Sequence, residues 1–448
     1  MDSLSCCSSL CDIRNLSIST VPEPEGHQRI ETKICDLPDD LLLQILRFLP
    51  TKETAATTIL SKRWRQLWTM LPVLYYIGKG SESIRWFIEK SLQLHKAPKL
   101  FTLIVTVCPS SPVDVDLGIC VENAVNRGVI LLAFSILWKA DPTSFPKSLY
   151  TCDTLSYLLL SNEVLVDVSS QAHLPSLSHL FLDEVVYKDE DSLVNLLSSS
   201  PVLKQLKVYR RKDDNLTNFT VKVASLQTLV YTADMSQNED EDDENSNGSL
   251  VIDSPALINL ALVDERGDYC LIENMPCLDV TFIHLCDNLS DTFLRSLSSV
   301  IHMDLFFLES MVAYCNAVIY SSLVELNFCP GSFVDCLDPL MVLLHNSPKL
   351  KSLTLDTEAH SFPLSWNQPS SIPGCLSSYL EIFRWKAYGG TEDERQLMTY
   401  ILGNSNCLKT VEIEIESNLE ERQHEIESMP RISTSSRLLF PTKMKKKV

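Results

Sequence analysis

The sequence predicts an α/β protein in which a small helical unit precedes a solenoid of parallel strands and helices. Three observations support this prediction for the chain of 448 residues. Residues 36–69 contain three short helix patterns with more apolar and aromatic side chains than so small a unit can bury by itself. A leucine-based strand pattern then recurs along most of the chain. Several intervals of this pattern contain a helix signal.

The helical unit begins with a segment that suits a helix opening. Asp36 can cap the first helix, and Pro38 suits its first turn. Apolar side chains follow at helical spacing until Pro50 ends this helix. Thr51 is expected to cap a second helix that runs to about residue 60, and Ser61 a third. In the third helix, large aromatic side chains lie beside Lys and Arg, a combination typical of binding hot spots.

The run DLPDDLLLQILRFLPTKETAATTILSKRWRQLW resembles the F-box, and LSKRWR is its most specific part. The F-box family uses three helices to dock on an SKP-type adaptor protein, which links it to a cullin-RING ubiquitin ligase. The resemblance implies that ten residues divide between the core of the unit and the adaptor interface. These are Leu37, Pro38, Leu42, Ile45, Leu46, Leu49, Pro50, Leu60, Trp64 and Trp68. Spacing alone leaves another interpretation open, in which the helices cap the following domain.

The repeat is an apolar residue, two others, an apolar residue, one other and a further apolar residue. From Leu100 it recurs at intervals of 21 to 31 positions, with weak members at 129 and 278. Helix signals begin near Asp191, Asp291 and Asp338. One such unit cannot bury its inner face, whereas stacked units share a core and pair their strands in parallel. A conventional two-layer α/β domain would also alternate strands and helices.

Segments such as LPSLSHLFLDEVVYKDEDSLVNLLSSSPVLKQLKV are similar to the leucine-rich repeats of plant F-box proteins that carry a C-terminal FBD module. Residues 375–440 are similar to that module: they predict a strand, a turn at Tyr388-Gly389-Gly390, an acidic helix start and a further strand. The plant F-box/FBD/leucine-rich-repeat family therefore implies a three-helix F-box, a leucine-rich-repeat solenoid of parallel strands and helices, and an FBD module.

The expected boundaries follow from these patterns. They are 1–30 for a disordered N-terminal tail, 31–78 for the F-box, 79–374 for the leucine-rich-repeat region with an acidic loop at 236–248, 375–440 for the FBD module and 441–448 for a basic tail. The acidic run is typical of a solvated loop, with capture of a basic target segment as the alternative. The basic tail is a nuclear address or a frayed end.

Composition narrows the classes of partner. A net charge of −20 argues against a nucleic-acid-binding surface, because phosphate contacts need clustered Lys and Arg. The longest apolar run, around 129–138, is about half of the roughly 20 residues that a membrane span requires. The N-terminus lacks the pattern of a secretory signal. We therefore expect no nucleic-acid or membrane partner, and a soluble protein of the cytoplasm, the nucleus or both.

The sequence carries no recognisable motif for catalysis. It contains no Gly-rich phosphate loop, GxSxG elbow or HExxH motif, and its nine histidines are scattered. Its 15 cysteines include no CxxC pair, and the closest cluster lies in the Ser-rich N-terminal tail. We therefore expect a non-catalytic protein with no cofactor and no metal site.

The family resemblance implies a substrate-recognition subunit of an SKP-adaptor, cullin and F-box ubiquitin ligase. Such a subunit holds a target protein beside a ubiquitin-charged enzyme, so that the transfer becomes effectively intramolecular. The candidate substrate contacts are outward-facing strand positions on the concave surface of the solenoid. They are His179, Phe181, Gln205, Lys207, Glu325 and Asn327. The alternative function is a non-ligase repeat scaffold or ligand receptor in which the helical module is a cap.

Overall fold

The computed structural model divides the chain into two compact units, Met1–Leu165 and Val166–Val448. It describes residues 34–78, 80, 83–112, 114–138, 140–233, 248–266, 269–273, 275–285, 291–307, 318–330, 337–357, 366–367, 369–415 and 419–441. The expected N-terminal tail, the acidic loop apart from Gly248 and the basic tail apart from Pro441 lie outside these residues. Within the described part of the chain, no helix combines the length and the apolar character needed to cross a bilayer.

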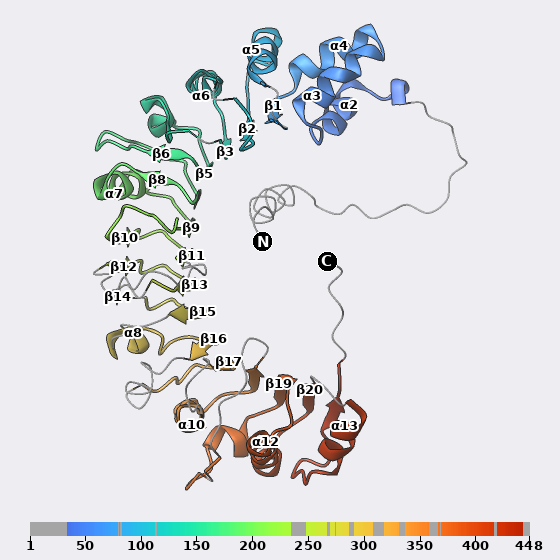
Figure 1. Cartoon of the computed structure of the whole chain (residues 1–448), viewed down its shortest axis with the longest axis vertical. Coiled ribbons are helices and arrows are strands. Elements are labelled where there is room, and N and C mark those ends of the chain that lie inside the picture. Colours follow the sequence, from blue (N-terminus) through green and yellow to red (C-terminus); the bar gives the residue numbers. More distant parts are fainter. Residues whose placement is uncertain are drawn as a thin grey trace. The chain divides into compact units, whose positions relative to one another are not determined.

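The first unit opens with the three expected helices, accompanied by short 3-10 turns (Figure 1). Their bounds are η1 Ile34–Asp36, α2 Asp39–Leu46, α3 Thr51–Ala56, η2 Thr57–Ile59, α4 Lys62–Leu67 and η3 Trp68–Met70. Ser61 occupies the N-cap position of α4, as predicted, although its side chain caps no backbone N–H.

The caps of the first two helices differ from the prediction. Pro38 and Pro50 occupy the N-cap positions of α2 and α3. Asp36 ends the preceding 3-10 turn two residues before the N-cap position, and among the described residues no side chain caps α2. Thr51 is the first residue of α3, and its hydroxyl instead accepts a hydrogen bond from the backbone N–H of Tyr75 at 2.7 Å. A polar residue expected to cap a helix therefore joins α3 to the first strand.

A parallel sheet with strand order β1-β2-β3-β5 follows in the first unit. The strands are β1 Val73–Ile77, β2 Thr102–Val107, β3 Leu131–Ile136 and β5 Tyr157–Asn162, and the shorter β4 Thr143–Ser144 pairs with β6 Val164–Val166. Helices α5 (Arg85–Leu94) and α6 (Leu117–Val125) connect the first three strands. Strand β1 was not among the predicted repeats, although Leu71, Leu74 and Tyr76 fit the same pattern and are buried.

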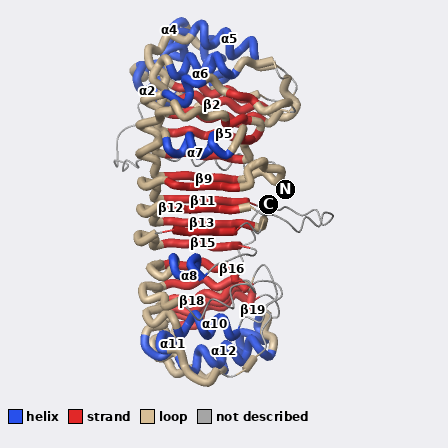
Figure 2. Tube along the Cα trace, turned by 90° about the vertical axis from the view of Figure 1, so that its left-hand side faces the viewer, coloured by secondary structure: helices blue, strands red, loops and turns tan. Residues whose placement is uncertain are grey.

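The second unit continues the repeat as a parallel sheet in which each strand pairs with its neighbours in one unbroken order (Figure 2). The strands are β7 His179–Asp183, β9 Gln205–Tyr209, β11 Thr228–Ala233, β13 Asn259–Asp264, β15 Val280–Leu285, β16 His302–Phe307, β17 Glu325–Pro330, β18 Ser352–Asp356, β19 Ile382–Tyr388, β20 Thr410–Ile415 and β21 Arg437–Leu439. This sequential order is that of a repeat solenoid. The weak repeat at 278 leads directly into β15.

Opposite this sheet lie a second parallel ladder and the helices of the unit (Figure 1). The ladder has the order β10 Asn218–Lys222, β12 Ser249–Asp253 and β14 Tyr269–Glu273, and β8 spans Val186–Tyr187. The helices are α7 Glu190–Ser198, α8 Asp291–Ser296, α10 Leu337–His345, α11 Gly374–Ser378, α12 Glu392–Asn404 and α13 Leu419–Ser428. Leucines before and within the strands, such as Leu203, Leu226 and Leu257, fill the space between the layers and have 0% exposure.

Helix starts in this unit lie close to the predicted positions. Asp189, two residues before the expected Asp191, caps α7 by accepting the backbone N–H of Ser192 at 2.8 Å. The predicted strand, turn, helix and strand near the C-terminal end are β19, a Gly389-Gly390 turn, α12 and β20. Gly390 has a φ of +71°, and a Cβ there would meet the guanidinium group of Arg422.

Candidate protein-docking surfaces

The core of the helical unit consists of side chains from α2, α4 and η3 and the residue that follows them. It comprises Leu42, Leu46, Trp64, Leu67, Trp68 and Leu71, against which Leu37, Leu43, Leu49 and Ala55 pack. Four of the ten residues assigned to core or adaptor interface, Leu42, Leu46, Trp64 and Trp68, are therefore core residues with at most 6% exposure. Both tryptophans hold the unit together and present almost no surface to a partner.

Other large apolar side chains of the helical unit, on α2, on its 3-10 turns and between the helices, remain on the surface. Six of them are called the exposed apolar set: Ile34 (50% exposed), Leu41 (40%), Ile45 (41%), Phe48 (70%), Ile59 (87%) and Leu60 (57%). Leu41, Ile45 and Phe48 are spaced four and three residues apart, so they share one side of α2 and the turn after it.

Only Ile45 and Leu60 of the exposed apolar set were selected from the sequence. Pro38 is also exposed and Pro50 is half-buried. The remaining members of the set were missed because the helical spacing was used to find the stripe that faces the core. The signal that identifies them is the large apolar residue that lies off this stripe, as Phe48 does.

Polar contacts fix the helices that carry the exposed apolar set. Arg63 of α4 donates from Nε to Oδ1 of Asp39 at 2.6 Å and from Nη2 to the carbonyl oxygen of Leu37 at 2.6 Å. These bonds hold the start of α2 against α4. Because Arg63 and Asp39 are partly exposed to water, the pair positions the helices more than it stabilises them.

The candidate substrate contacts of the second unit all lie on the sheet face opposite the helices and are partly exposed. His179 and Phe181 of β7 pair in register with Gln205 and Lys207 of β9. The ammonium group of Lys207 lies 5.1 Å from the centre of the Phe181 ring, a distance at which a cation attracts the ring face. The structure therefore brings these four residues together.

The other two candidates belong to a separate polar group on β16 and β17. Glu325 lies 3.1 Å from Nδ1 of His302 and 3.7 Å from Nη1 of Arg384. Asn327 hydrogen-bonds Asp304, and burial raises the pKa of the Asp304 carboxyl above its ordinary value. Strands β11, β13 and β15 separate this group from the one on β7 and β9.

From β11 to the polar group on β16 and β17, the same face of the sheet is hollowed by a groove of 390 Å³. Its lining comes from strands β11 to β17 and includes Val230, Ala261, Val280 and Phe282. None of these four was selected from the sequence. The available signal was the pair Val280 and Phe282, apolar residues at outward positions of a strand, where they are 40% and 45% exposed.

Comparison with known proteins agrees with this architecture. Residues 34–76 match the F-box domain, residues 121–245 match the leucine-rich repeats of FBD-associated F-box protein At5g56370, and residues 368–413 match the FBD module. The chain is 61% identical over 442 residues to putative F-box/FBD/LRR-repeat protein At1g22000 of Arabidopsis thaliana, covering 95% of both chains. It is 38% identical to F-box/FBD/LRR-repeat protein At4g26340 of the same plant, covering 91% of this chain and 99% of the relative.

The chain belongs to the plant F-box/FBD/LRR-repeat family. The helical unit is accordingly its F-box, the stacked strands are its leucine-rich repeats, and the segment around β19, α12 and β20 is its FBD module.

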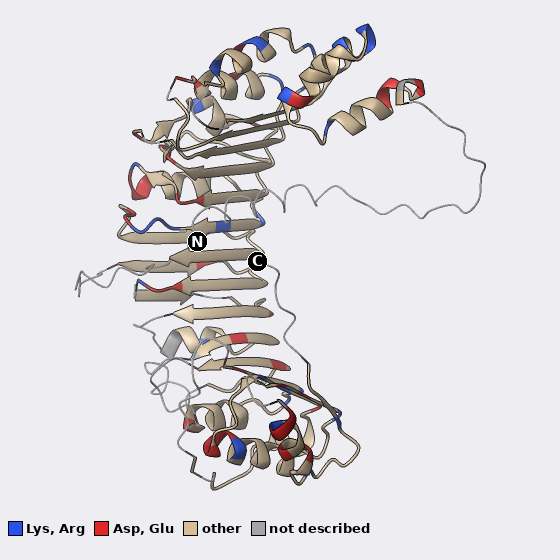
Figure 3. Ribbon diagram, turned by 45° about the vertical axis from the view of Figure 1, so that its right-hand side comes forward, with Lys and Arg blue, Asp and Glu red and all other residues tan. Residues whose placement is uncertain are grey.

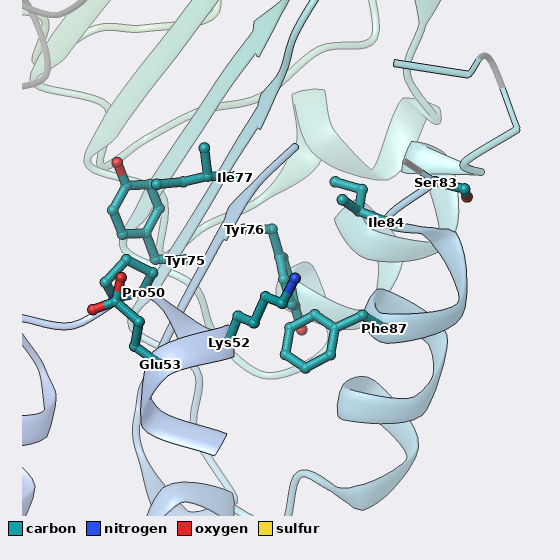
Figure 4. A pocket seen from close by; sticks show the side chains of 9 residues that line it. All are labelled: Pro50, Lys52, Glu53, Tyr75, Tyr76, Ile77, Ser83, Ile84 and Phe87. Atoms are coloured by element: carbon teal, nitrogen blue, oxygen red, sulfur yellow. The ribbon is translucent and has the colours of Figure 1, made fainter. Parts of the chain in front are cut away.

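A smaller cavity of 240 Å³ lies between α3 of the F-box, β1 and α5 (Figure 4). The side chain of Lys52 extends toward the ring of Phe87, and Tyr76 forms part of the wall. The hydroxyl group of Tyr76 hydrogen-bonds Ser91 at 2.6 Å, and burial raises the pKa of this phenol. The volume is below the roughly 300 to 1,000 Å³ usual for small-molecule sites. Among the described residues, no group of His, Cys, Asp and Glu side chains is arranged to hold a metal ion.

Proposed function

We propose that this chain is the substrate-recognition subunit of an SKP-adaptor, cullin and F-box ubiquitin ligase. The observation that supports the proposal is the F-box surface. Its core is complete, yet Phe48 and Ile59 are 70% and 87% exposed outside that core. Apolar side chains kept in water by a small folded unit are what a partner protein would bury.

In this function the exposed apolar set binds the SKP-type adaptor, and the adaptor links the chain to a cullin-RING ligase. The leucine-rich repeats hold the target protein. The chain performs no catalysis. It raises the local concentration of a target lysine beside the ubiquitin-charged enzyme, so that an encounter between two molecules becomes effectively intramolecular. We further propose that it acts in the cytoplasm, the nucleus or both.

The test is capture of purified SKP-type adaptor by the full-length chain and by a double variant, Phe48→Ser with Ile59→Ser. Both side chains lie outside the core, so circular dichroism of this variant should match that of the parent chain. The matched control is Trp86→Ser, which removes a side chain that is 69% exposed on α5, outside the F-box helices. Trp64→Ala is unsuitable because Trp64 is a core residue.

We expect the parent and Trp86→Ser to capture the adaptor, and the double variant to lose about a thousandfold in affinity, since each of the two large anchors contributes about 2 kcal/mol. Equal capture by the parent and the double variant would show that the exposed apolar set is not the adaptor interface. No capture by a folded parent would leave the alternative function, a repeat scaffold or receptor with a helical cap.

A further inference from the structure

Two rows of outward side chains cross strands β11 to β17 in the second unit. In the first row, each residue pairs in register with the next one on the neighbouring strand, in the order Val230, Ala261, Phe282, Asp304 and Asn327. The second row is built in the same way from Thr228, Asn259, Val280, His302 and Glu325. Each row therefore begins with uncharged side chains on β11 to β15. The first row then reaches the carboxyl group of Asp304 on β16, and the second that of Glu325 on β17.

The hollow in the groove has a simple origin in side-chain size. Ala261 stands in the first row between Val230 and Phe282, so a small side chain is flanked by two larger ones. Phe282 and the neighbouring Val280 are 45% and 40% exposed, although both are apolar. The floor and one wall of the groove thus offer apolar surface to a side chain that enters at Ala261.

The β16 end of the groove is acidic. Asp304 is half-buried there, and burial together with the neighbouring Glu325 raises the pKa of its carboxyl. Arg384 lies 3.7 Å from Glu325 and 2.7 Å from Glu412, and Lys386 pairs with Asp356 at 2.6 Å. These two cations therefore face four carboxyl groups, those of Asp304, Glu325, Asp356 and Glu412, and the local charge stays negative. Figure 3 colours the positions of acidic residues red, and such positions lie on neighbouring strands in this part of the sheet.

We propose that this groove binds an extended segment of the target protein, in which an apolar side chain fills the hollow at Ala261 and a nearby Lys or Arg pairs with Asp304 and Glu325. Two strand steps separate Ala261 from Asp304, about 10 Å at the usual strand spacing. An extended chain covers that distance in about three residues. The apolar and the basic residue are therefore two to four positions apart, and a net charge of −20 favours approach of such a segment.

This inference deepens the proposed function, because it names the kind of segment that the substrate-recognition subunit holds. It is tested separately from adaptor capture. Full-length protein is immobilised through a C-terminal tag, with the SKP-type adaptor added, and a random decapeptide library displayed on phage is selected on it. We expect enrichment of peptides that carry an aromatic, Leu or Ile residue two to four positions from Lys or Arg.

The best selected peptide is then synthesised with a fluorescent label, and its affinity is measured by anisotropy. Ala261→Phe fills the hollow and should weaken binding at least tenfold, as should Phe282→Ser, which removes an exposed wall. Asp304→Asn should weaken binding at least fivefold for this peptide, but less than twofold for the same peptide with its basic residue changed to Gln. The control Tyr269→Ser removes a side chain that is 49% exposed on β14, in the other ladder, and should bind like the parent.

Three results would overturn the proposal. The first is selection of no peptide, or of peptides without the apolar and basic pair. The second is unchanged affinity in both Ala261→Phe and Phe282→Ser. The third is self-association of the protein in sedimentation that Ala261→Phe abolishes, which would identify a second copy as the occupant. Each groove variant should still capture the adaptor, so failure of the groove and failure of the ligase function are distinguishable.

Discussion

Replacing Asp214 by Leu should destabilise the second unit by about 3 to 5 kcal/mol, because it leaves a buried guanidinium group without its counter-charge. Arg210 and Asp214 have fully buried side chains, and Nε of Arg210 lies 2.6 Å from Oδ2 of Asp214. Arg210 also donates to the hydroxyl group of Tyr231 at 3.0 Å and to the carbonyl oxygen of Leu216 at 2.5 Å. These bonds fix the segment that leads from β9 to β10.

The expected loss of stability in Asp214→Leu has two parts, the lost charge and a lost hydrogen bond. Its second oxygen accepts the backbone N–H of Leu216 at 2.9 Å, and Leu at this position would leave that N–H unpaired. Asp214→Asn keeps an oxygen for the N–H but removes the charge, so it should be less harmful than Asp214→Leu by about 1 to 3 kcal/mol. Adding Arg210→Met to Asp214→Leu removes the stranded cation and should recover part of the loss.

The assay is urea unfolding of the full-length protein, with hydrogen exchange of β9 and β11 measured by mass spectrometry to locate the effect. A matched control is Asp213→Leu, since Asp213 pairs with Arg211 at 3.0 Å but is 77% exposed. That pair should contribute at most about 1 kcal/mol. If Asp214→Leu proves no more destabilising than Asp213→Leu, the reasoning from burial is wrong for this site.

Three further predictions concern polar groups that the fold uses internally. Burial and the Arg127 charge lower the pKa of His95 to about 4, so the stability that this group contributes above pH 6.5 is lost as the pH falls toward 4. At pH 5 the loss is about 1 to 2 kcal/mol, and His95→Gln should flatten the dependence of the free energy of unfolding on pH between 6.5 and 4. Thr51→Val leaves the N–H of Tyr75 unpaired and should lower the free energy of unfolding by about 1 to 3 kcal/mol in urea, whereas an unchanged midpoint would exclude this role. Glu394→Ala breaks the capping box of α12 and should lower stability by about 1 kcal/mol, seen as a lower melting temperature.

The strands were predictable because their leucines all have the same role, which is to fill the core of the repeat. Leu203, just before β9, and Leu206 and Val208 within it are all 0% exposed, and the same positions recur in and before the neighbouring strands. A buried position that must be apolar leaves a periodic trace in the sequence. The ladder of β10, β12 and β14 left a weaker trace, since Phe219, Leu250 and Cys270 occupy equivalent buried positions without a shared residue type.

Helix caps were less predictable because a capping residue type has several possible partners. Thr51 is a strong N-cap type, yet its hydroxyl bonds Tyr75, which is 24 residues away in the sequence. Pro50 can occupy the cap position because it needs no N–H partner and already has an extended backbone. Local preference identified the start of the helix within one residue, and tertiary contact decided the role of the side chain.

The exposed surface of the F-box and the groove of the repeats were both difficult to predict, because sequence periodicity identifies buried residues better than docking residues. In the F-box, helical periodicity marks residues that the unit buries for itself, such as Trp64, and it does not mark the exposed Phe48. In the repeats, alternation marks which residues face outward but not which of them adjoin a hollow. The groove depends on Ala261 lying between Val230 and Phe282, residues 31 positions before it and 21 after it, which only the register brings together. A protein-docking surface is therefore best sought among apolar residues that the core pattern leaves over, and then tested against the neighbours that the fold gives them.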